Sequence, residues 1–205
     1  MALTKLNFGG NQTALVASNI PTLTGSSMPV GAILQTVTAN EMTAATYAST
    51  DSSNPKTVIS ASITPSATNS KILLTGFISI GVLYSSYNGT LHYVGVRLKR
   101  GSTVIGETTD LSSATAVHGA DATGARPMHS MARDEGYSAS KNQSIPFHFV
   151  DTPSTTSAIT YNIQGVIERH ANQYTMVRNI GGYNYNTDEM ASATCQLTLQ
   201  EIKGS

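Results

Sequence analysis

The sequence predicts an all-β protein, an antiparallel β-sandwich that resembles a jelly roll and carries an extended N-terminal arm. Three observations support this fold class. Seven to nine short segments are apolar and polar in alternation, clusters of turn-forming residues separate them, and no 12-residue stretch has a helical period. Sheets stacked face to face are the usual result of such a pattern. We expect an arm over residues 1–30 and one sandwich domain over residues 31–205.

The N-terminal 30 residues are broken by glycine, asparagine and proline, and their apolar pieces are short. This segment has too little apolar surface to fold alone, so we expect an extended arm that attaches to another molecule. The first strand is expected at residues 31–39. Residues 40–55 are small and polar with no clear period, and a helical turn at residues 41–46 is the only regular element considered there.

Residues 56–107 are expected to hold two strand pairs. Residues 71–82 are apolar on both alternating sides, which predicts a central strand buried on both faces. The strand before it, at residues 57–63, ends in a cluster of turn formers at residues 64–70. Residues 91–100 alternate, with Arg97 and Lys99 on a solvated side. Gly101 and Ser102 suit a two-residue hairpin turn that leads to a short returning strand at residues 103–107.

The C-terminal half is expected to begin with a long insertion. Residues 108–144 show no convincing strand, and a loop of this length is usually functional or mobile. Strands resume at residues 145–151, where Pro146 indicates an edge strand or a strand start. The cleanest alternation in the chain follows at residues 158–168. A shorter strand is expected at residues 175–180, and a last alternating strand at residues 193–202.

The composition argues against charged partners. Only 12% of the residues are charged, against about a quarter in a typical domain, whereas the chain has 24 serines and 27 threonines. The formal net charge is 0, so no global field attracts nucleic acid or an anionic membrane. A net charge of zero also favours association between copies.

Cysteine content and hydropathy narrow the protein class further. Cys195 is the only cysteine, which excludes an intrachain disulfide and any zinc site built on several thiolates. Its neighbours Leu197 and Leu199 on the same side predict a small buried residue. The N-terminus lacks the apolar run of a secretion signal, and no stretch reaches 18 apolar residues. We expect no membrane insertion and no cofactor.

Five phrases in order resemble a known family. They are GAILQTV, SASITPSATNSKILLTG, VRLKRGSTVIGE, IPFHFVDTPSTTSAITYNIQG and ATCQLTLQEIKG, which span most of residues 31–204. Together they are similar to tail-fibre or virion structural proteins of marine bacteriophages and prophages, including cyanophages. The chain departs from shorter members of that family at residues 108–144 and at residues 181–187.

The resemblance implies a homotrimeric β-sandwich located on the virion. It also implies that the arm at residues 1–30 docks to other virion proteins and that outer loops meet the host surface. A host surface glycan is the receptor expected from the loop described next. Such a protein would be made in the host bacterial cytoplasm, in keeping with the missing signal peptide.

A loop rich in tyrosine and asparagine is the candidate receptor site. Tyrosine rings stack on sugars, and the amides and carboxylate beside them can bond sugar hydroxyls without any net charge. The residues concerned are Tyr183, Asn184, Tyr185, Asn186 and Asp188. The alternative is an ordinary β-turn loop, because turns collect such residues for conformational reasons.

The remaining histidines, carboxylates and cations of the sequence predict neither a metal site nor a catalytic site. No two of the possible ligands His118, Asp121, His129, Asp134 and Glu135 have a metal-binding spacing, so no metal is expected. The cations Lys71, Arg97, Lys99 and Arg100 form either a patch for anionic polysaccharide or, more simply, a solvated strand face. Nothing resembles a hydrolase motif, so we expect no enzyme activity.

Three functions remain open at this point. The first is a tail-fibre protein that attaches the particle to the host by non-covalent contact. The second is a capsid decoration, cement or tail accessory protein that touches no receptor. The third is a carbohydrate-active enzyme.

Overall fold

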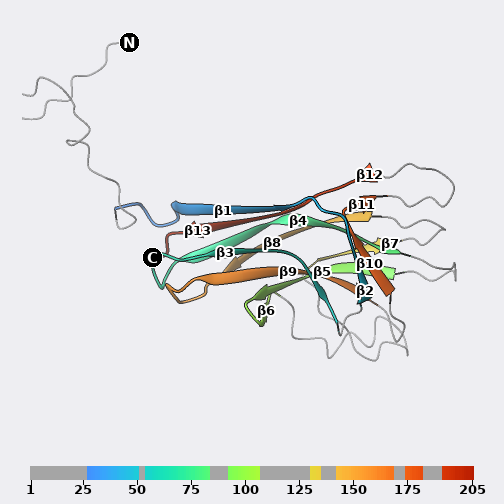
Figure 1. Ribbon diagram of the computed structural model, residues 1–205. Coiled ribbons are helices and arrows are strands. Elements are labelled where there is room, and N and C mark those ends of the chain that lie inside the picture. The colour runs from blue at the N-terminus through green and yellow to red at the C-terminus, as the bar shows by residue number, and fades with distance from the viewer. Residues whose placement is uncertain are drawn as a thin grey trace, which may run out of the picture.

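The computed structural model describes residues 27–50, 54–83, 92–106, 130–134, 142–168, 174–181 and 191–205. In these ranges the regular elements are all β-strands, and each pair of strands runs antiparallel. Two sheets are stacked on each other (Figure 1). The antiparallel all-β sandwich predicted from the sequence is therefore confirmed. The described ranges hold no helix with the length and apolarity needed to cross a membrane.

The first sheet has six strands that occupy four lines, where a line is either one strand or two strands that follow each other end to end in the sheet. Its strands are β1 (Ile33–Glu41), β2 (Ala45–Thr50), β4 (Lys71–Leu83), β8 (Asn142–Asp151), β10 (Tyr174–Arg178) and β13 (Cys195–Ile202). One edge of β4 pairs with β8. Its other edge pairs first with β13 and then with β10, so these two lie end to end. In the same way β1 and β2 follow each other along β13 and β10.

The second sheet repeats this arrangement with five strands. It contains β3 (Lys56–Ile63), β5 (His92–Arg100), β6 (Thr103–Ile105), β7 (Ser130–Asp134) and β9 (Ile159–Glu168). One edge of β5 pairs with β9, which also pairs with β3. The other edge of β5 pairs with β6 near its end and with β7 near its start. Thus β6 and β7 form one interrupted line, and this sheet also has four lines.

The order of these lines defines a jelly roll. Numbered along the chain, the lines are β1/β2, β3, β4, β5, β6/β7, β8, β9 and β10/β13. The first sheet then has the order 6-3-8-1 and the second the order 2-7-4-5. The chain passes back and forth between the sheets, which is the eight-stranded double-sheet topology of a jelly roll. The topology suggested by the sequence pattern is confirmed.

The core lies between the sheets and follows from the two-residue alternation of each strand. On β4 the even-numbered residues Ile72, Leu74, Ile78 and Ile80 are fully buried, and β5, β9 and β13 contribute matching apolar sets. Burial of each such side chain stabilises the fold by about 1.5–3 kcal/mol. At Gly76 a Cβ atom would overlap the backbone carbonyl of Gln196, so only glycine fits this point of the β4 line.

Several elements match the predicted positions. Gly101 has φ +56 and, with Ser102, joins Arg100 to its partner Thr103, as expected for a hairpin turn that begins with glycine. Pro146 lies on β8, which pairs with β4 and with no other described strand. The expected edge position of this proline is therefore confirmed for the described part of the sheet.

Two expectations about local structure were wrong. Residues 45–50 form β2 rather than part of a helical turn or loop, because β10 supplies the hydrogen-bond partners that their composition does not announce. The region 108–144 was expected to lack strands, yet it contains β7, paired with β5, and the first residues of β8. Residues 107–129 and 135–141 lie outside the described ranges.

A third expectation needs correction, because β4 is central in its sheet but is buried on both faces only in its second half, where Ser79 and Gly81 are buried. Its outward residues Leu73, Thr75 and Phe77 are half-buried. The sandwich has two layers, so the outer face of the first sheet stays partly exposed over this first half of β4.

Both chain ends leave the sandwich at one end (Figure 1). The Gly31 N–H donates to the Lys203 carbonyl over 2.9 Å, and the Lys203 N–H donates to the Ala32 carbonyl over 2.9 Å. The Lys203 ammonium also donates to the Met28 carbonyl. The last residues of the predicted arm are thus tied to the C-terminal segment, and residues 1–26 lie outside the described ranges. The short strands β11 (Ile180–Gly181) and β12 (Ala191–Ser192) lie toward the opposite end.

Candidate functional site

The predicted receptor residues Tyr183, Asn184, Tyr185, Asn186 and Asp188 lie outside the described ranges. The structure does describe the stem from which they extend. Ile180 pairs with Ser192 and Gly181 with Ala191, which makes a two-stranded antiparallel ladder. Residues 182–190 therefore connect the two strands of a hairpin stem. Their role in sugar binding stays a prediction.

The stem leaves the sheet at one residue, Asn179. β10 ends at Arg178 and β13 continues the same line from Cys195, so the hairpin interrupts a single strand line. Asn179 has φ +56, a left-handed conformation that asparagine tolerates better than most residues. Its N–H donates to the Ser79 carbonyl over 3.1 Å, and its carbonyl accepts from the Ala193 N–H over 3.3 Å. These bonds fix the point where the chain departs and returns.

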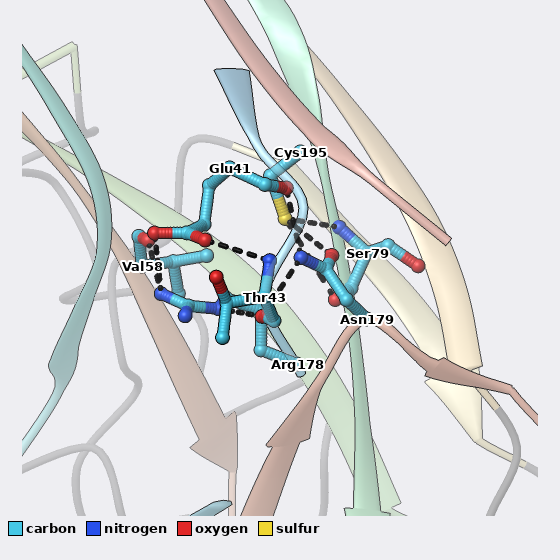
Figure 2. Close-up of polar contacts among 7 residues, drawn as sticks. All are labelled: Glu41, Thr43, Val58, Ser79, Arg178, Asn179 and Cys195. Carbon is cyan, nitrogen blue, oxygen red and sulfur yellow. Dashed lines mark hydrogen bonds and ion pairs between the residues drawn. The ribbon is translucent and has the colours of Figure 1, made fainter. Parts of the chain in front are cut away.

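A network of polar side chains holds this point and is drawn in Figure 2. We call it the polar junction; it consists of Glu41, Thr43, Ser79, Arg178, Asn179 and Cys195. The Asn179 amide donates to the Glu41 carbonyl over 2.8 Å and to the Thr43 carbonyl over 3.2 Å. Glu41 is the last residue of β1, and Thr43 lies in the break between β1 and β2. The polar junction thus joins the interruption of one strand line to the interruption of its neighbour.

Cys195 closes the polar junction on the side of β4. Its thiol donates to the Asn179 side-chain oxygen over 3.1 Å and accepts from the Ser79 N–H over 3.2 Å. Burial raises the pKa of this thiol. A buried thiol with a raised pKa stays protonated near neutral pH and is a poor nucleophile. The prediction that Cys195 is a small buried residue is confirmed.

Arg178 carries the one positive charge of the polar junction. The residue is 8% exposed, and its guanidinium donates to the Thr43 carbonyl over 3.2 Å and to the Val58 carbonyl over 2.8 Å. The Val58 carbonyl belongs to β3, so Arg178 links the two sheets. Its Nη1 atom lies 3.5 Å from Glu41 Oε2, and its Cζ atom lies 5.7 Å from the ring centroid of Tyr47. A buried charge with this many partners is compensated rather than available to a ligand.

Glu41 balances that charge from the edge of the polar junction. Its carboxylate accepts from the Thr43 N–H over 2.8 Å. This bond first, then the Thr43 side chain and the attraction of Arg178, hold the pKa of Glu41 below its ordinary value despite some desolvation. Glu41 is therefore ionised at neutral pH and is already engaged as an acceptor.

A second polar group crosses the core between β8, β5 and β9. Arg100 Nη1 lies 3.1 Å from both carboxylate oxygens of Asp151, and the Tyr161 hydroxyl donates to Asp151 over 2.7 Å. Burial raises the pKa of Tyr161, and the bond to Asp151 adds to this shift. The triad joins the first sheet to the second through one shared carboxylate.

A third group, the Glu201 clamp, lies at the end where the termini leave. One oxygen of the fully buried Glu201 accepts from the Ser66 N–H over 2.7 Å and from the Ser66 and Ser70 hydroxyls, each over 2.6 Å. The other oxygen accepts from the Gln35 amide over 2.6 Å. Desolvation opposes ionisation, but these bonds outweigh it and lower the pKa of Glu201. The clamp fixes the turn at residues 64–70 to β13 and β1.

These three groups hold strands and turns together through hydrogen bonds and ion pairs. The carboxylates of Glu41, Asp151 and Glu201 all accept from donors on nearby strands or turns, and a satisfied buried network rigidifies a core. Within the described ranges no three histidine, cysteine, aspartate or glutamate side chains come together as a metal site. Of the weighed metal ligands, only Asp134 falls in a described strand, β7.

The basic side chains considered for a polysaccharide patch are separated. Arg97 and Lys99 share the outer face of β5 and are half-buried, whereas Arg100 turns to Asp151. Lys71 is exposed on β4, in the other sheet. The structure therefore does not gather the four cations on one face.

Sequence reasoning missed the buried polar residues Arg178, Asn179 and Glu201. The signal for Glu201 was available, because it follows Cys195, Leu197 and Leu199 on the inward side of one alternating strand. No comparable signal marks Arg178 and Asn179, whose partners Thr43 and Val58 are distant in sequence.

No family model and no curated protein matches this chain. Among solved structures, a chain of the infectious bursal disease virus Gt strain is similar at 14% identity, with a TM-score of 0.39; the match covers 84% of this chain and 39% of that one. The Gx strain gives 10% identity, a TM-score of 0.38, and coverage of 83% and 42%. The VP2 subviral particle of the same virus gives 11% identity and a TM-score of 0.36, and the match covers 83% of this chain and 42% of that one. The chain thus spans about two fifths of the length of these viral chains.

Proposed function

We propose that the protein is a virion structural protein of tail-fibre type, which attaches a phage particle to the host cell surface through loops displayed by a jelly roll. The fold by itself selects no function, because jelly rolls serve in capsids, lectins and other proteins. The proposal therefore depends on how the displayed segments are placed and on the chemistry of their residues.

The observation that carries the proposal is the opposite placement of two segments. The arm leaves the sandwich next to Lys203, whereas the hairpin stem β11–β12 lies toward the other end (Figure 1). One end can therefore dock to a particle while the other faces outward. The five-phrase resemblance to phage tail-fibre proteins supports the same arrangement, with the arm bound to other virion proteins and three copies in the assembly.

The chemistry of residues 182–190 suits a neutral sugar. Tyr183 and Tyr185 offer flat rings, and the adjacent Asn184, Asn186 and Asp188 offer acceptors and donors for hydroxyl groups. A formal net charge of 0 adds no electrostatic attraction, so each contact is weak. Several copies on one particle raise the effective concentration for the next contact and compensate for this weakness.

Variants of the hairpin test the proposal. Particles that carry Tyr183→Ala together with Tyr185→Ala should adsorb to host cells at least tenfold more slowly than wild type, because the stacking rings are lost. Tyr87→Ala, a tyrosine in a different connecting segment, is the matched control and should adsorb normally. Unchanged adsorption by the double variant, with normal incorporation into particles, would remove the proposed receptor site.

A capsid decoration or cement protein is the second candidate. The uncovered outer face of the first sheet, with Leu73 and Phe77 half-buried on β4, favours it because such a face suits packing on a protein neighbour. Images of particles with the chain labelled distinguish the two functions. Copies at the tail periphery support the fibre, and copies on the capsid lattice support cement.

A further inference from the structure

The arm and the hairpin stem are attached to two neighbouring strands. The arm continues into β1, which starts at Ile33, and the hairpin stem continues from Ser192 into β13, which starts at Cys195. β1 and β13 pair antiparallel and lie side by side along the sandwich (Figure 1). Ile33 pairs with Ile202, the last residue of β13, whereas Cys195 pairs with Glu41, the last residue of β1. The two strands therefore begin at opposite ends of one ladder.

A pull on the arm and on the hairpin stem loads this ladder in shear. It draws β1 and β13 in opposite directions along their common axis, each from its own start. The hydrogen bonds of an antiparallel ladder are perpendicular to the strands, so an axial pull strains all of them together. A pull on Gly31 and Ser205 is different, because both lie at the same end of the ladder (Figure 1). The pairs would then open one after another.

Side-chain hydrogen bonds also cross the β1–β13 pair along its length. In each case the two residues are direct partners in the ladder. They are Gln35 and Glu201 over 2.6 Å, Thr36 and Gln200 over 3.5 Å, and Asn40 and Gln196 over 3.1 Å. Because these bonds span the gap between the strands, they add to the interactions that an axial pull must break together.

Further contacts hold the pair where the hairpin leaves. The Asn179 amide donates to the carbonyls of Glu41 and Thr43, and the Arg178 guanidinium donates to the Thr43 carbonyl. On its other side, β13 pairs with β4 over residues 196–202. β13 is thus held by two ladders, whereas β1 lies at the edge of the described sheet. The strand that yields first under this pull is therefore β1.

We propose that the β1–β13 pair has a mechanical function and carries the tension between the arm and the hairpin while a particle is held on a host surface. The source of this tension rests on the proposed function, in which the arm docks to the particle and the hairpin to the host. The resistance to tension does not, because it follows from the register of two strands. It can be measured on the isolated chain, so the two proposals can fail separately.

Single-molecule pulling on the full-length chain tests the mechanical function in two geometries. The arm–hairpin geometry uses handles at Val30→Cys, a position that is 65% exposed, and at Thr187→Cys, which lies between β11 and β12 in the sequence. The arm–C-terminus geometry uses Val30→Cys and Ser205→Cys. The native Cys195 is buried and stays unmodified. At one pulling speed, the arm–hairpin geometry should require a force roughly twofold higher or more, since its ladder bonds must break together.

Paired substitutions identify the strands that carry the force. Thr36→Ala together with Asn40→Ala removes two acceptors on β1 and should lower the force in the arm–hairpin geometry. Ser62→Ala together with Thr160→Ala is the matched control and should leave it unchanged, because these direct partners bond over 2.7 Å across β3 and β9. Circular dichroism of each variant establishes that it has folded.

Two results would overturn the mechanical function. The first is an equal force in both geometries for the folded chain. The second is a loss of force in the control variant as large as in the β1 variant. Particles that adsorb normally after the loss of Tyr183 and Tyr185 would count against the receptor site and would leave the difference between the two pulling geometries as it is.

Discussion

At the scale of single residues, Asn179 combines several structural roles. It combines a left-handed backbone with a side chain that bonds the end of β1 and the break between β1 and β2. The same side chain accepts from the Cys195 thiol. One residue therefore turns the chain out of the sheet into the hairpin stem, and its side chain satisfies backbone carbonyls of the neighbouring strand line.

Substitution of Asn179 separates these two contributions. Asn179→Gly keeps the left-handed conformation but loses the side-chain bonds, and should lower the free energy of unfolding by about 2 kcal/mol. Asn179→Ala should cost about 1 kcal/mol more, because its Cβ disfavours φ +56. Urea unfolding of both variants measures the difference. An alanine variant as stable as the glycine variant would show that the backbone conformation contributes nothing.

At the scale of elements, the Glu201 clamp joins a turn to two strands. The turn at residues 64–70 connects β3 in one sheet to β4 in the other, so its position sets how the sheets meet at this end. Four donors converge on one buried carboxylate, and three of them come from that turn. The turn is thereby fixed by a charged acceptor that lies on β13, outside the turn itself.

The Glu201 clamp should make stability depend on pH. The pKa of Glu201 is lowered in the folded state, so the unfolded chain takes up a proton first as pH falls. The stabilisation is present in full above the ordinary glutamate pKa of about 4.3 and is lost as pH falls through the lower folded value. Glu201→Gln should cost about 2–3 kcal/mol at pH 7, where donors lose an acceptor.

Urea unfolding at pH 7 and at pH 3 gives the measurement. The difference between wild type and Glu201→Gln should shrink at pH 3, because pH 3 lies below the ordinary glutamate pKa, so the unfolded wild-type chain binds a proton at Glu201 and part of the stabilisation is lost. Ser66→Ala is the control; it removes one donor and no titrating group, and should cost less than Glu201→Gln at pH 7. A gap between wild type and Glu201→Gln that does not change with pH would contradict the assigned role of the charge.

At the scale of the whole molecule, the fold is a sandwich with insertions. The line β6/β7 is interrupted between Ile105 and Ser130, and the line β10/β13 is interrupted between Arg178 and Cys195. In both cases the strand resumes its pairing with the same neighbour. The jelly roll should therefore fold without the inserted residues.

Replacement of residues 182–190 by Asn-Gly tests that conclusion. Gly181 and Ala191 are direct partners, so a two-residue turn can join them. The shortened chain should unfold within a few degrees of wild type, because the polar junction and the core are retained, while host adsorption of particles should fall as in the tyrosine variants. A large loss of thermal stability would show that the inserted residues help to hold the sandwich.

Comparison of β13 with β2 shows what could be read from the sequence. The alternation of β13 identified its position and its buried side, because a period of two places one set of side chains inward whatever the neighbours are. The antiparallel sandwich, the Gly101–Ser102 turn and the edge position of Pro146 followed from equally local rules. β2 and β7 were missed because their strand character comes from pairing with β10 and β5, and local composition carries no record of such distant partners.

The sequence by itself determined the strands that have a clear apolar side, and it identified the residues with two tyrosines between β11 and β12 as a receptor candidate. Only the tertiary structure decided that β10 and β13 form one line, that Arg178 and Asn179 hold its interruption, and that Leu73 and Phe77 remain uncovered. The reason is physical. Alternation and turn chemistry act over a few residues, whereas register, charge compensation and uncovered faces arise between residues that meet only when the two sheets close.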